Sequence, residues 1–305
     1  MHPHRPNPPP LRDGLAASCV VTPGQLSTGT PALAFFTQRF PFVAATEWHA
    51  RFAAGDVLDT QGRPIGANTE LVRGQRLYYF RAVPAEPVVP FEASVLWQNG
   101  DLLVADKPHF LPVIPSGKYV RETLLVRLRA ALGLEHLSPI HRIDRDTAGL
   151  VLFSINPATR NAYQALFRER AVHKVYHGVA DWRPELDWPI ARSSHIGSSA
   201  HFMQQQEIAG TPNAHTHIRP LRVQGEQALY EMRPITGQRH QLRVHMAALG
   251  LPLEGDGIYP ELLPEDALDY RRPLQLLAHQ IGFTDPLTGK WLQFTSRRQL
   301  RIGMV

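Results

Sequence analysis

The pattern of apolar and polar positions predicts short helices mixed with short strands, without a regular alternation of the two. Apolar residues recur at helical spacing over residues 31–39, 46–54, 121–132, 156–169 and the stretch that follows 237. Short apolar runs bounded by turn residues predict strands over 77–80, 95–97, 102–105, 151–154, 174–179 and 227–234. No internal repeat is visible. Strands and helices mixed in this way indicate an α+β fold.

Turn and capping residues sharpen three of these elements. Asn99-Gly100-Asp101 separates two strand segments and predicts a hairpin. Asn156-Pro157 predicts the start of a helix, with asparagine as the N-cap and proline in the first turn, where its missing donor costs nothing. In the helix that follows Thr236-Gly237, Leu242, Met246 and Leu249 form an apolar stripe.

Proline divides the chain into regions. Residues 1–10 contain five prolines and predict a flexible tail, because proline fixes φ and removes a backbone donor. Residues 11–82 are expected to form a small N-terminal α+β domain. Residues 83–90, with three prolines, predict a stiff extended linker. Residues 91–305 are then a second, larger domain.

Composition narrows the class of protein. The chain has 305 residues, of which 43% are hydrophobic and 19% charged, so that a globular protein is expected. It has neither a run of 18 apolar residues nor a signal-peptide pattern, and we therefore expect a cytoplasmic protein without a membrane span. A single cysteine, Cys19, excludes an internal disulfide and cysteine-rich zinc sites. The net charge of +5 permits a polyanionic partner but does not establish one.

The first segment with chemical character is the run 141–150, His-Arg-Ile-Asp-Arg-Asp-Thr-Ala-Gly-Leu. Five ionisable side chains in six positions stand directly before an apolar strand, which predicts a polar loop held at the edge of a core. Such a loop is a candidate catalytic centre. The alternative is a solvated turn in which Arg and Asp neutralise one another.

The second segment, 236–246, is strongly cationic. From Met232 to Met246 there are three arginines, two histidines and no acid, and Arg239 and Arg243 are four positions apart, as on one helix face. A cationic helix N-terminus favours an anion, either phosphate or carboxylate. The alternative is an ordinary surface helix with a cationic face.

The histidines leave a metal site open as a third alternative. The candidate ligands are His215, His217, His240, His245 and His279, with Asp144 or Asp256. Metal-binding helices usually show tight spacing such as His-Glu-x-x-His, and no such spacing occurs here. We therefore expect no metal.

The two segments resemble motifs of the RluA family of RNA pseudouridine synthases. The family signature His-Arg-Leu-Asp-x-x-Thr-Ser-Gly-Leu corresponds to residues 141–150, with Ile143 for leucine and Ala148 for serine. A Lys-x-Tyr segment matches residues 174–176. The motif Thr-Gly-x-x-His-Gln-Leu-Arg-x-His, followed by Gly-Asp, matches residues 236–245 and 255–256. Residues 276–294 are similar to the family's C-terminal hairpin, so that the resemblance covers about 91–301.

The resemblance implies a catalytic fold, an activity and roles for particular residues. The implied fold is a central, mostly antiparallel mixed β-sheet flanked by helices, and the implied reaction is the isomerisation of uridine to pseudouridine in RNA without a cofactor. Asp144 matches the nucleophile, Tyr176 matches a tyrosine that lies against the target base, and Arg243 matches the arginine that supplies a positive charge to the aspartate.

Further residues are expected at the RNA. By similarity, Arg142 helps to extrude the target nucleotide, which an enzyme must unstack before it can act on the base. Leu242 is expected to pack under the base or under Asp144, as a core leucine also would. Arg145, Arg239 and His240 complete the expected RNA contacts.

The resemblance leaves the substrate and the flanking regions less defined. Structured RNA, either ribosomal or transfer RNA, is the expected partner of a monomeric enzyme. Residues 46–80 loosely resemble the S-four-type RNA-binding domain, and 181–224 are expected to form variable loops and strands that touch RNA. The remaining alternatives are an RNA-binding protein without catalysis and a metal-dependent hydrolase.

Overall fold

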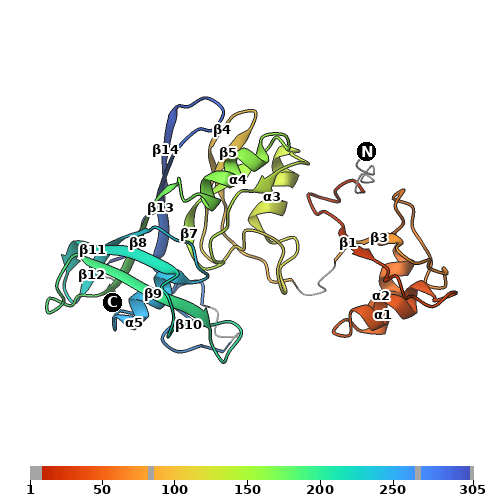
Figure 1. Ribbon diagram of the computed structural model, residues 1–305, viewed down its shortest axis with the longest axis horizontal. Coiled ribbons are helices and arrows are strands. Elements are labelled where there is room, and N and C mark those ends of the chain that lie inside the picture. The colour runs from red at the N-terminus through yellow and green to blue at the C-terminus, as the bar shows by residue number, and fades with distance from the viewer. Residues whose placement is uncertain (1–8, 82–85, 265–268, 303–305) are drawn as a thin grey trace. The chain divides into compact units, whose positions relative to one another are not determined.

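The computed structural model describes residues 9–81, 86–264 and 269–302 of the chain (Figure 1). The chain forms two compact units. The first comprises the chain up to Pro87 together with Ser116–Arg121 and Val126–Glu135, and the second comprises the remainder. The predicted tail at 1–10 and the start of the predicted linker at 83–90 lie largely outside the described residues. Two segments beyond that linker belong to the first unit.

The first unit contains a small antiparallel sheet, two complete helices and most of a third. Strands β1 (Ser18–Val21), β3 (Arg76–Tyr79) and β2 (Val57–Leu58) pair in that order, and the helices are α1 (Ala32–Arg39) and α2 (Ala45–Ala53). Both predicted helices are confirmed. Their apolar faces meet in an aromatic cluster, in which the Phe36 and Trp48 ring centroids lie 4.6 Å apart. Arg51 of the loosely S-four-like segment is buried and pairs with Glu47, so that its charge is turned inward.

The second unit is built on one large mixed sheet. Within the described residues eleven strands take part: nine run in the order β10-β9-β11-β12-β8-β13-β7-β5-β4, with β14 paired to β13 and β6 to β7. All pairings are antiparallel except that between β13 and β7. The expected α+β fold with a mostly antiparallel mixed sheet is confirmed.

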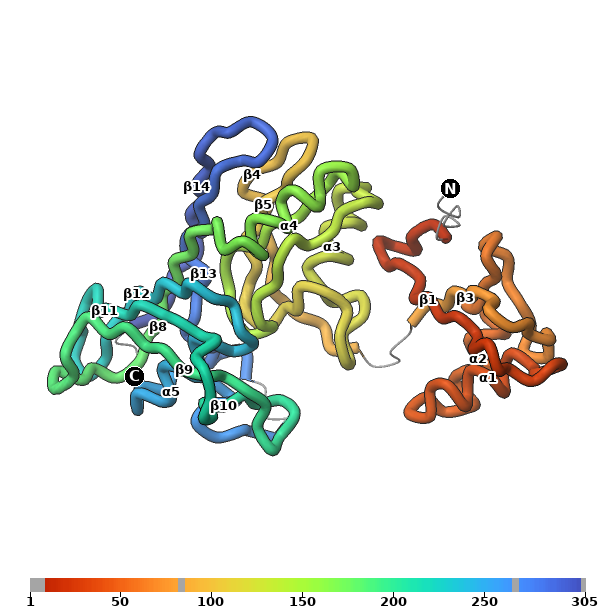
Figure 2. Tube along the Cα trace, viewed as in Figure 1, coloured from red at the N-terminus to blue at the C-terminus, as the bar shows by residue number. Residues whose placement is uncertain are grey.

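The bounds of these elements follow the chain. The strands are β4 (Ser94–Gln98), β5 (Leu102–Lys107), β6 (Ser138–Pro139), β7 (Ala148–Ser154), β8 (His173–Asp181), β9 (Ile190–Ser198), β10 (Gln205–Ile208), β11 (Ala214–Gln224), β12 (Gln227–Pro234), β13 (Leu276–Thr284) and β14 (Trp291–Thr295). The helices are α4 (Arg160–Arg168) and α5 (Gln241–Ala248), together with the start of α3 (Leu124–Leu132), whose residues from Val126 onward belong to the first unit. The predicted β4–β5 hairpin is confirmed. The C-terminal hairpin expected from the resemblance is present as β13 and β14, side by side in Figure 2.

Burial explains which strands lie at the centre. Every residue of β5 and β7 is buried, as expected for strands covered on both faces. Tyr163 of α4 packs among apolar residues of β5, β7 and β13. On the other half of the sheet, Leu242 and Met246 of α5 join the core formed by Tyr230 and Met232 of β12. The apolar stripe predicted for this helix therefore faces the sheet.

Two predicted helix starts are wrong. Helix α4 begins at Arg160, because the Asn156 side chain accepts the Ala158 N–H at 3.0 Å and closes a turn instead of capping a helix. Helix α3 begins at Leu124 rather than 121. The N–H groups of Val120 and Arg121 bind the Glu86 carboxylate, which holds that stretch outside the helix.

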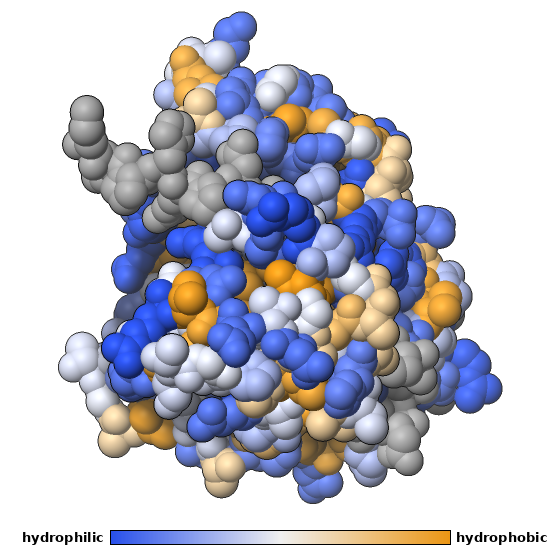
Figure 3. All heavy atoms as spheres, turned by 90° about the vertical axis from the view of Figure 1, so that its right-hand side faces the viewer, coloured by the Kyte–Doolittle hydropathy of each residue, from blue (hydrophilic) through white to orange (hydrophobic). Residues whose placement is uncertain are grey.

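The surface is of mixed character. On the face drawn in Figure 3, hydrophilic side chains cover much of the molecule and hydrophobic ones are scattered among them. In the part of the chain that the structure describes, no helix is long and apolar enough to cross a membrane.

Candidate active site

The loop between β6 and β7 carries the first motif and is fixed at its start by His141. The imidazole Nε2 accepts the Leu152 N–H at 3.1 Å, and the ring stacks on Phe167 with centroids 4.6 Å apart. Burial, with the positive charge of Lys174, lowers the pKa of His141 to about 3. The histidine is therefore a neutral acceptor that ties the loop to β7.

The other end of the loop is fixed by a close approach of two strands. Gly149 has φ +107°, and a Cβ at this position would lie 2.3 Å from the Ala278 carbonyl oxygen, because β13 runs parallel to β7 here. A residue with a side chain does not fit. The glycine of the motif is thus required by the sheet that supports the loop.

A buried lysine holds the middle of the loop. Lys107, at the end of β5, is fully buried and donates to the carbonyl oxygens of Pro108, Leu111 and Arg145 at 2.8–2.9 Å. Burial lowers the pKa of Lys107 to about 7, against the raising effect of the Asp146 and Asp144 charges. The contact to Arg145 fixes the backbone directly after Asp144.

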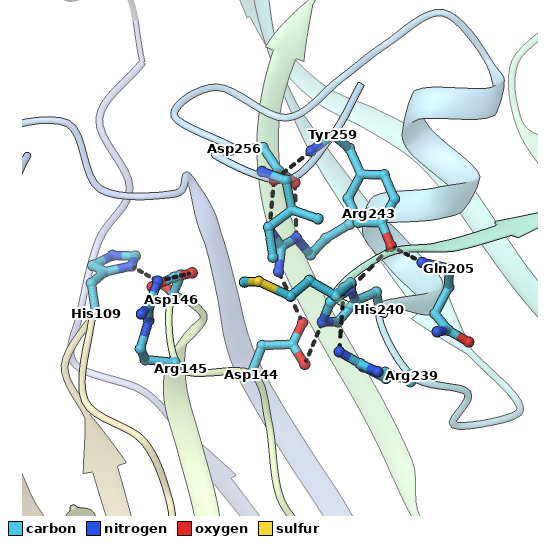
Figure 4. Close-up of polar contacts among 12 residues, drawn as sticks. His109, Asp144, Arg145, Asp146, Gln205, Arg239, His240, Arg243, Asp256 and Tyr259 are labelled. Atoms are coloured by element: carbon cyan, nitrogen blue, oxygen red, sulfur yellow. Dashed lines mark hydrogen bonds and ion pairs between the residues drawn. The ribbon is translucent and has the colours of Figure 1, made fainter. Parts of the chain in front are cut away.

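Asp144 lies beside a buried arginine (Figure 4). Nη1 of Arg243 is 3.4 Å from Oδ2 of Asp144, while Nε and Nη2 bind Asp256 at 2.8 and 2.5 Å. The Arg243 and Asp256 side chains are 2% and 1% exposed, whereas that of Asp144 is 29% exposed. The two hydrogen bonds to the buried Asp256 carboxylate fix the guanidinium group. Its remaining nitrogen, Nη1, then faces the more accessible carboxylate of Asp144.

Arg243 stays protonated in this buried cluster. Burial would lower the pKa of Arg243, but the hydrogen bonds and charge of Asp256, with the charges of Asp144 and Asp146, raise it above its usual value. The N–H groups of Ile258 and Tyr259 bind Oδ1 of Asp256 at 2.8 and 3.1 Å. A permanent positive charge therefore lies beside the Asp144 carboxylate.

A cavity that is open to solvent lies over this pair. The expected site residues in its wall are Arg142, Asp144, Tyr176, His240, Leu242 and Arg243. Lys174, whose Nζ donates to the Thr236 carbonyl oxygen at 3.0 Å, also lines it. Burial, together with the Asp144 charge, raises the pKa of Tyr176 above its usual range. Tyr176 is therefore a neutral phenol in the free protein.

Arg145 and Arg239, the two other expected RNA contacts, do not line the cavity. Arg145 forms a fork on the neighbouring Asp146, with Nε at 2.8 Å and Nη2 at 3.2 Å. Arg239 is exposed and donates to the carbonyl oxygens of Phe202 and Met203 at 3.0 and 3.3 Å. Their predicted role at the RNA stays a prediction, while the structure gives both a role in holding loops.

The cationic segment differs from the predicted helix face. Helix α5 begins at Gln241, and His240 before it has φ +56°, so that Arg239 and Arg243 do not share one helix face. The anion expected at this helix is supplied by the chain itself, since Arg243 binds the carboxylate of Asp256. That acid lies 13 positions further along the chain, outside the acid-free stretch.

The histidines proposed as metal ligands are dispersed. His245 contacts Thr216 and Ser194, His215 contacts Ser193, and His279 stacks on His177 with centroids 3.9 Å apart. Among the residues that the structure describes, no three His, Cys, Asp or Glu side chains gather so that they could hold a metal ion. The geometry thus does not favour a metal-dependent hydrolase.

Two important residues were missed from the sequence. Lys107 follows Asp106 at the end of an apolar run, and two charges closing a buried strand are a signal of a buried polar site. Tyr259, four positions after Gly255, carries no such signal. Its contact to His240 exists only because the chain after α5 folds back onto that helix.

The comparisons with known proteins agree with this geometry. The family model for RNA pseudouridylate synthase matches residues 101–248. An uncharacterized RNA pseudouridine synthase of Synechocystis sp. is 31% identical over 87% of this chain and 92% of its own. RNA pseudouridine synthase 5 of Arabidopsis thaliana is 26% identical over 90% of this chain and 87% of its own.

A solved structure shows the same fold. Human RNA Pseudouridylate Synthase Domain Containing 1 aligns with a TM-score of 0.57 and 21% identity, covering 70% of this chain and 86% of its own. The family model and the relatives that match this fold define an isomerase that acts on RNA. The chain belongs to the RluA-type family of RNA pseudouridine synthases. Its activity is the isomerisation of uridine to pseudouridine in RNA.

Proposed function

We propose that Asp144 is the nucleophile of this pseudouridine synthase. The observation that carries the proposal is the position of its carboxylate, in the wall of an open cavity and 3.4 Å from a buried guanidinium. Arg243 supplies a positive charge beside the carboxylate, and its two contacts with Asp256 hold the guanidinium in place.

The reaction is balanced without a co-reactant. A carboxylate oxygen of Asp144 forms a bond to C1′ of the ribose as the bond from C1′ to N1 of uracil breaks. The base then turns, C5 bonds to C1′, and the carboxylate is released. C5 loses a proton and N1 gains one, so that product and substrate have the same composition. Such chemistry needs a nucleophile and a proton carrier, and no oxidant.

Two further side chains act on the base. Tyr176 presents an aromatic ring on which the base stacks. Because its phenol is neutral, it accepts a proton from the substrate only if it releases its own proton at the same time. Arg142 is exposed at the cavity. Its guanidinium occupies the space in the base stack that the extruded nucleotide leaves.

The substrate is a uridine in structured RNA, ribosomal or transfer, modified by a monomeric enzyme in the cytoplasm. A relative from Zymomonas mobilis, 28% identical over 68% of this chain, is named ribosomal large subunit pseudouridine synthase D. That name makes ribosomal RNA the first substrate to test. Pseudouridines mapped in ribosomal and transfer RNA, from cells with and without the gene, will identify the target.

The test of the nucleophile is Asp144→Asn, compared with Asp187→Asn at an exposed acid outside the cavity. RNA labelled with tritium at C5 of uridine releases the label when C5 bonds to C1′. We expect no release from Asp144→Asn, RNA affinity within a few-fold of the wild type, and full activity from Asp187→Asn. Tritium release by Asp144→Asn at the wild-type rate would exclude Asp144 as the nucleophile.

A further inference from the structure

His240 occupies an unusual backbone position next to the proposed nucleophile. It has φ +56° directly before α5, and its side chain is 8% exposed in the wall of the cavity. Nε2 of the ring lies 3.9 Å from Oδ1 of Asp144, and Nδ1 lies 3.0 Å from the phenol oxygen of Tyr259 (Figure 4). The ring therefore bridges a buried phenol and the carboxylate.

The partners of Tyr259 define the direction of these hydrogen bonds. The Gln205 backbone N–H donates to the phenol oxygen at 2.7 Å, and Tyr259 is only 6% exposed. In the described chain, Gln205 and His240 are the polar partners of this oxygen. If Nδ1 also donated to it, the phenol proton would have no acceptor, which costs about 1–3 kcal/mol for a buried group. The phenol therefore donates to Nδ1.

The tautomer of His240 follows from this direction. A neutral imidazole carries one proton, and since Nδ1 accepts, the proton is on Nε2. Burial lowers the pKa of His240, the Asp144 charge raises it, and the Arg243 and Arg239 charges lower it again, with a net lowering. The ring is thus a neutral donor whose N–H points toward Asp144.

We propose that His240 is a positioning residue for Asp144: Tyr259 locks the Nε2–H tautomer, and this N–H directs Oδ1 while Arg243 directs Oδ2. Each carboxylate oxygen then faces one donor, which fixes the plane of the carboxylate. The distance of 3.9 Å in the free protein shortens when RNA fills the cavity, as catalytic contacts commonly do. This inference rests on the proposed role of Asp144 as the nucleophile.

Three substitutions of His240 separate positioning from folding. His240→Gln keeps an N–H donor at the place of Nε2, His240→Asn keeps one only at the place of Nδ1, and His240→Phe keeps none. Asparagine adopts positive φ more readily than glutamine or phenylalanine. A structural role therefore predicts that Asn is the mildest change, whereas the positioning role predicts that Gln is.

The rate assay uses RNA labelled with tritium at C5, with melting temperature measured on the same preparations. We expect His240→Phe and His240→Asn to lower kcat by about 10- to 100-fold, as for a misplaced reacting group. His240→Gln should recover at least half of that loss on a logarithmic scale, and KM should change little in all three. If Asn is as active as Gln or more active, the positioning role is overturned.

A second measurement tests the tautomer without reference to activity. In protein labelled with ¹⁵N at histidine, the His240 signals are identified as those missing from His240→Gln. We expect a protonated Nε2 and an unprotonated Nδ1, and a mixture of tautomers in Tyr259→Phe. A protonated Nδ1 in the wild type would overturn this inference and leave Asp144 as the nucleophile. An active Asp144→Asn would instead refute the proposed function.

Discussion

The substitution His141→Gln is expected to lower the stability of the protein at neutral pH and to raise it at acidic pH, relative to the wild type. The imidazole accepts the Leu152 N–H, and protonation would place a second donor against that N–H. The Gln side chain carries an oxygen at a comparable reach and does not titrate. The substitution therefore keeps the acceptor and removes the pH dependence.

The magnitude follows from the pKa values. The histidine pKa is 6.5 in the unfolded chain and about 3 in the folded one, so that the unfolded chain binds the proton first. The stabilising contribution of His141 is complete above pH 6.5 and falls as the pH drops toward 3. At pH 4.5, two pH units below 6.5, the loss is about 3 kcal/mol, at about 1.4 kcal/mol per pH unit.

At neutral pH a second effect of the substitution lowers the free energy of unfolding. The variant loses the stacked contact with Phe167, which is worth about 1 kcal/mol. We expect the variant to be less stable than the wild type by about 1 kcal/mol at pH 7.5. At pH 4.5 it should be more stable by about 2 kcal/mol, the difference between the two effects.

Urea unfolding, followed by tryptophan fluorescence, measures the free energy of unfolding at each pH. Four of the five tryptophans lie in the second unit. Burial lowers the pKa of His109, His177 and His245 to about 4, so both proteins should lose stability in acid. Only the difference between their curves reports on His141. His217→Gln, at an exposed position on β11, should give a curve parallel to the wild type. A parallel curve for His141→Gln would refute the reasoning.

Three other substitutions have expected outcomes. Asp256→Asn removes the charge partner of buried Arg243 and should cost about 3–5 kcal/mol in urea unfolding, together with most of the activity; an unchanged midpoint would contradict the ion pair. Gly149→Ala should lower stability by about 2 kcal/mol or more, measured by thermal unfolding, because its Cβ meets the Ala278 carbonyl oxygen; full stability would show that the strands can separate there. Arg142→Ala should lower tritium release about tenfold or more with no change in melting temperature, and equal losses of both would indicate a folding role.

Local features of the fold were predictable because their causes lie within a few residues. Strand β12 spans Gln227–Pro234, as its apolar run predicts, and the Asn99 turn joins β4 to β5. The motif residues Asp144, Tyr176 and Arg243 were identified by their order along the chain, and the structure brings them to one cavity. The order of the motifs along the sequence does not show how close these side chains lie in the folded protein.

The sequence by itself determined which side chains are the candidates for the chemistry, and the tertiary structure decided how they are paired. The cationic segment predicted an anion, but only the fold shows that Asp256 occupies one side of Arg243 and Asp144 the other, 99 positions away in sequence. The left-handed His240 likewise contacts a group distant in sequence, the phenol of Tyr259. The physical reason is that a charge or a hydrogen-bonding group is satisfied by any suitable partner, and the closure of the chain selects which partner lies within reach.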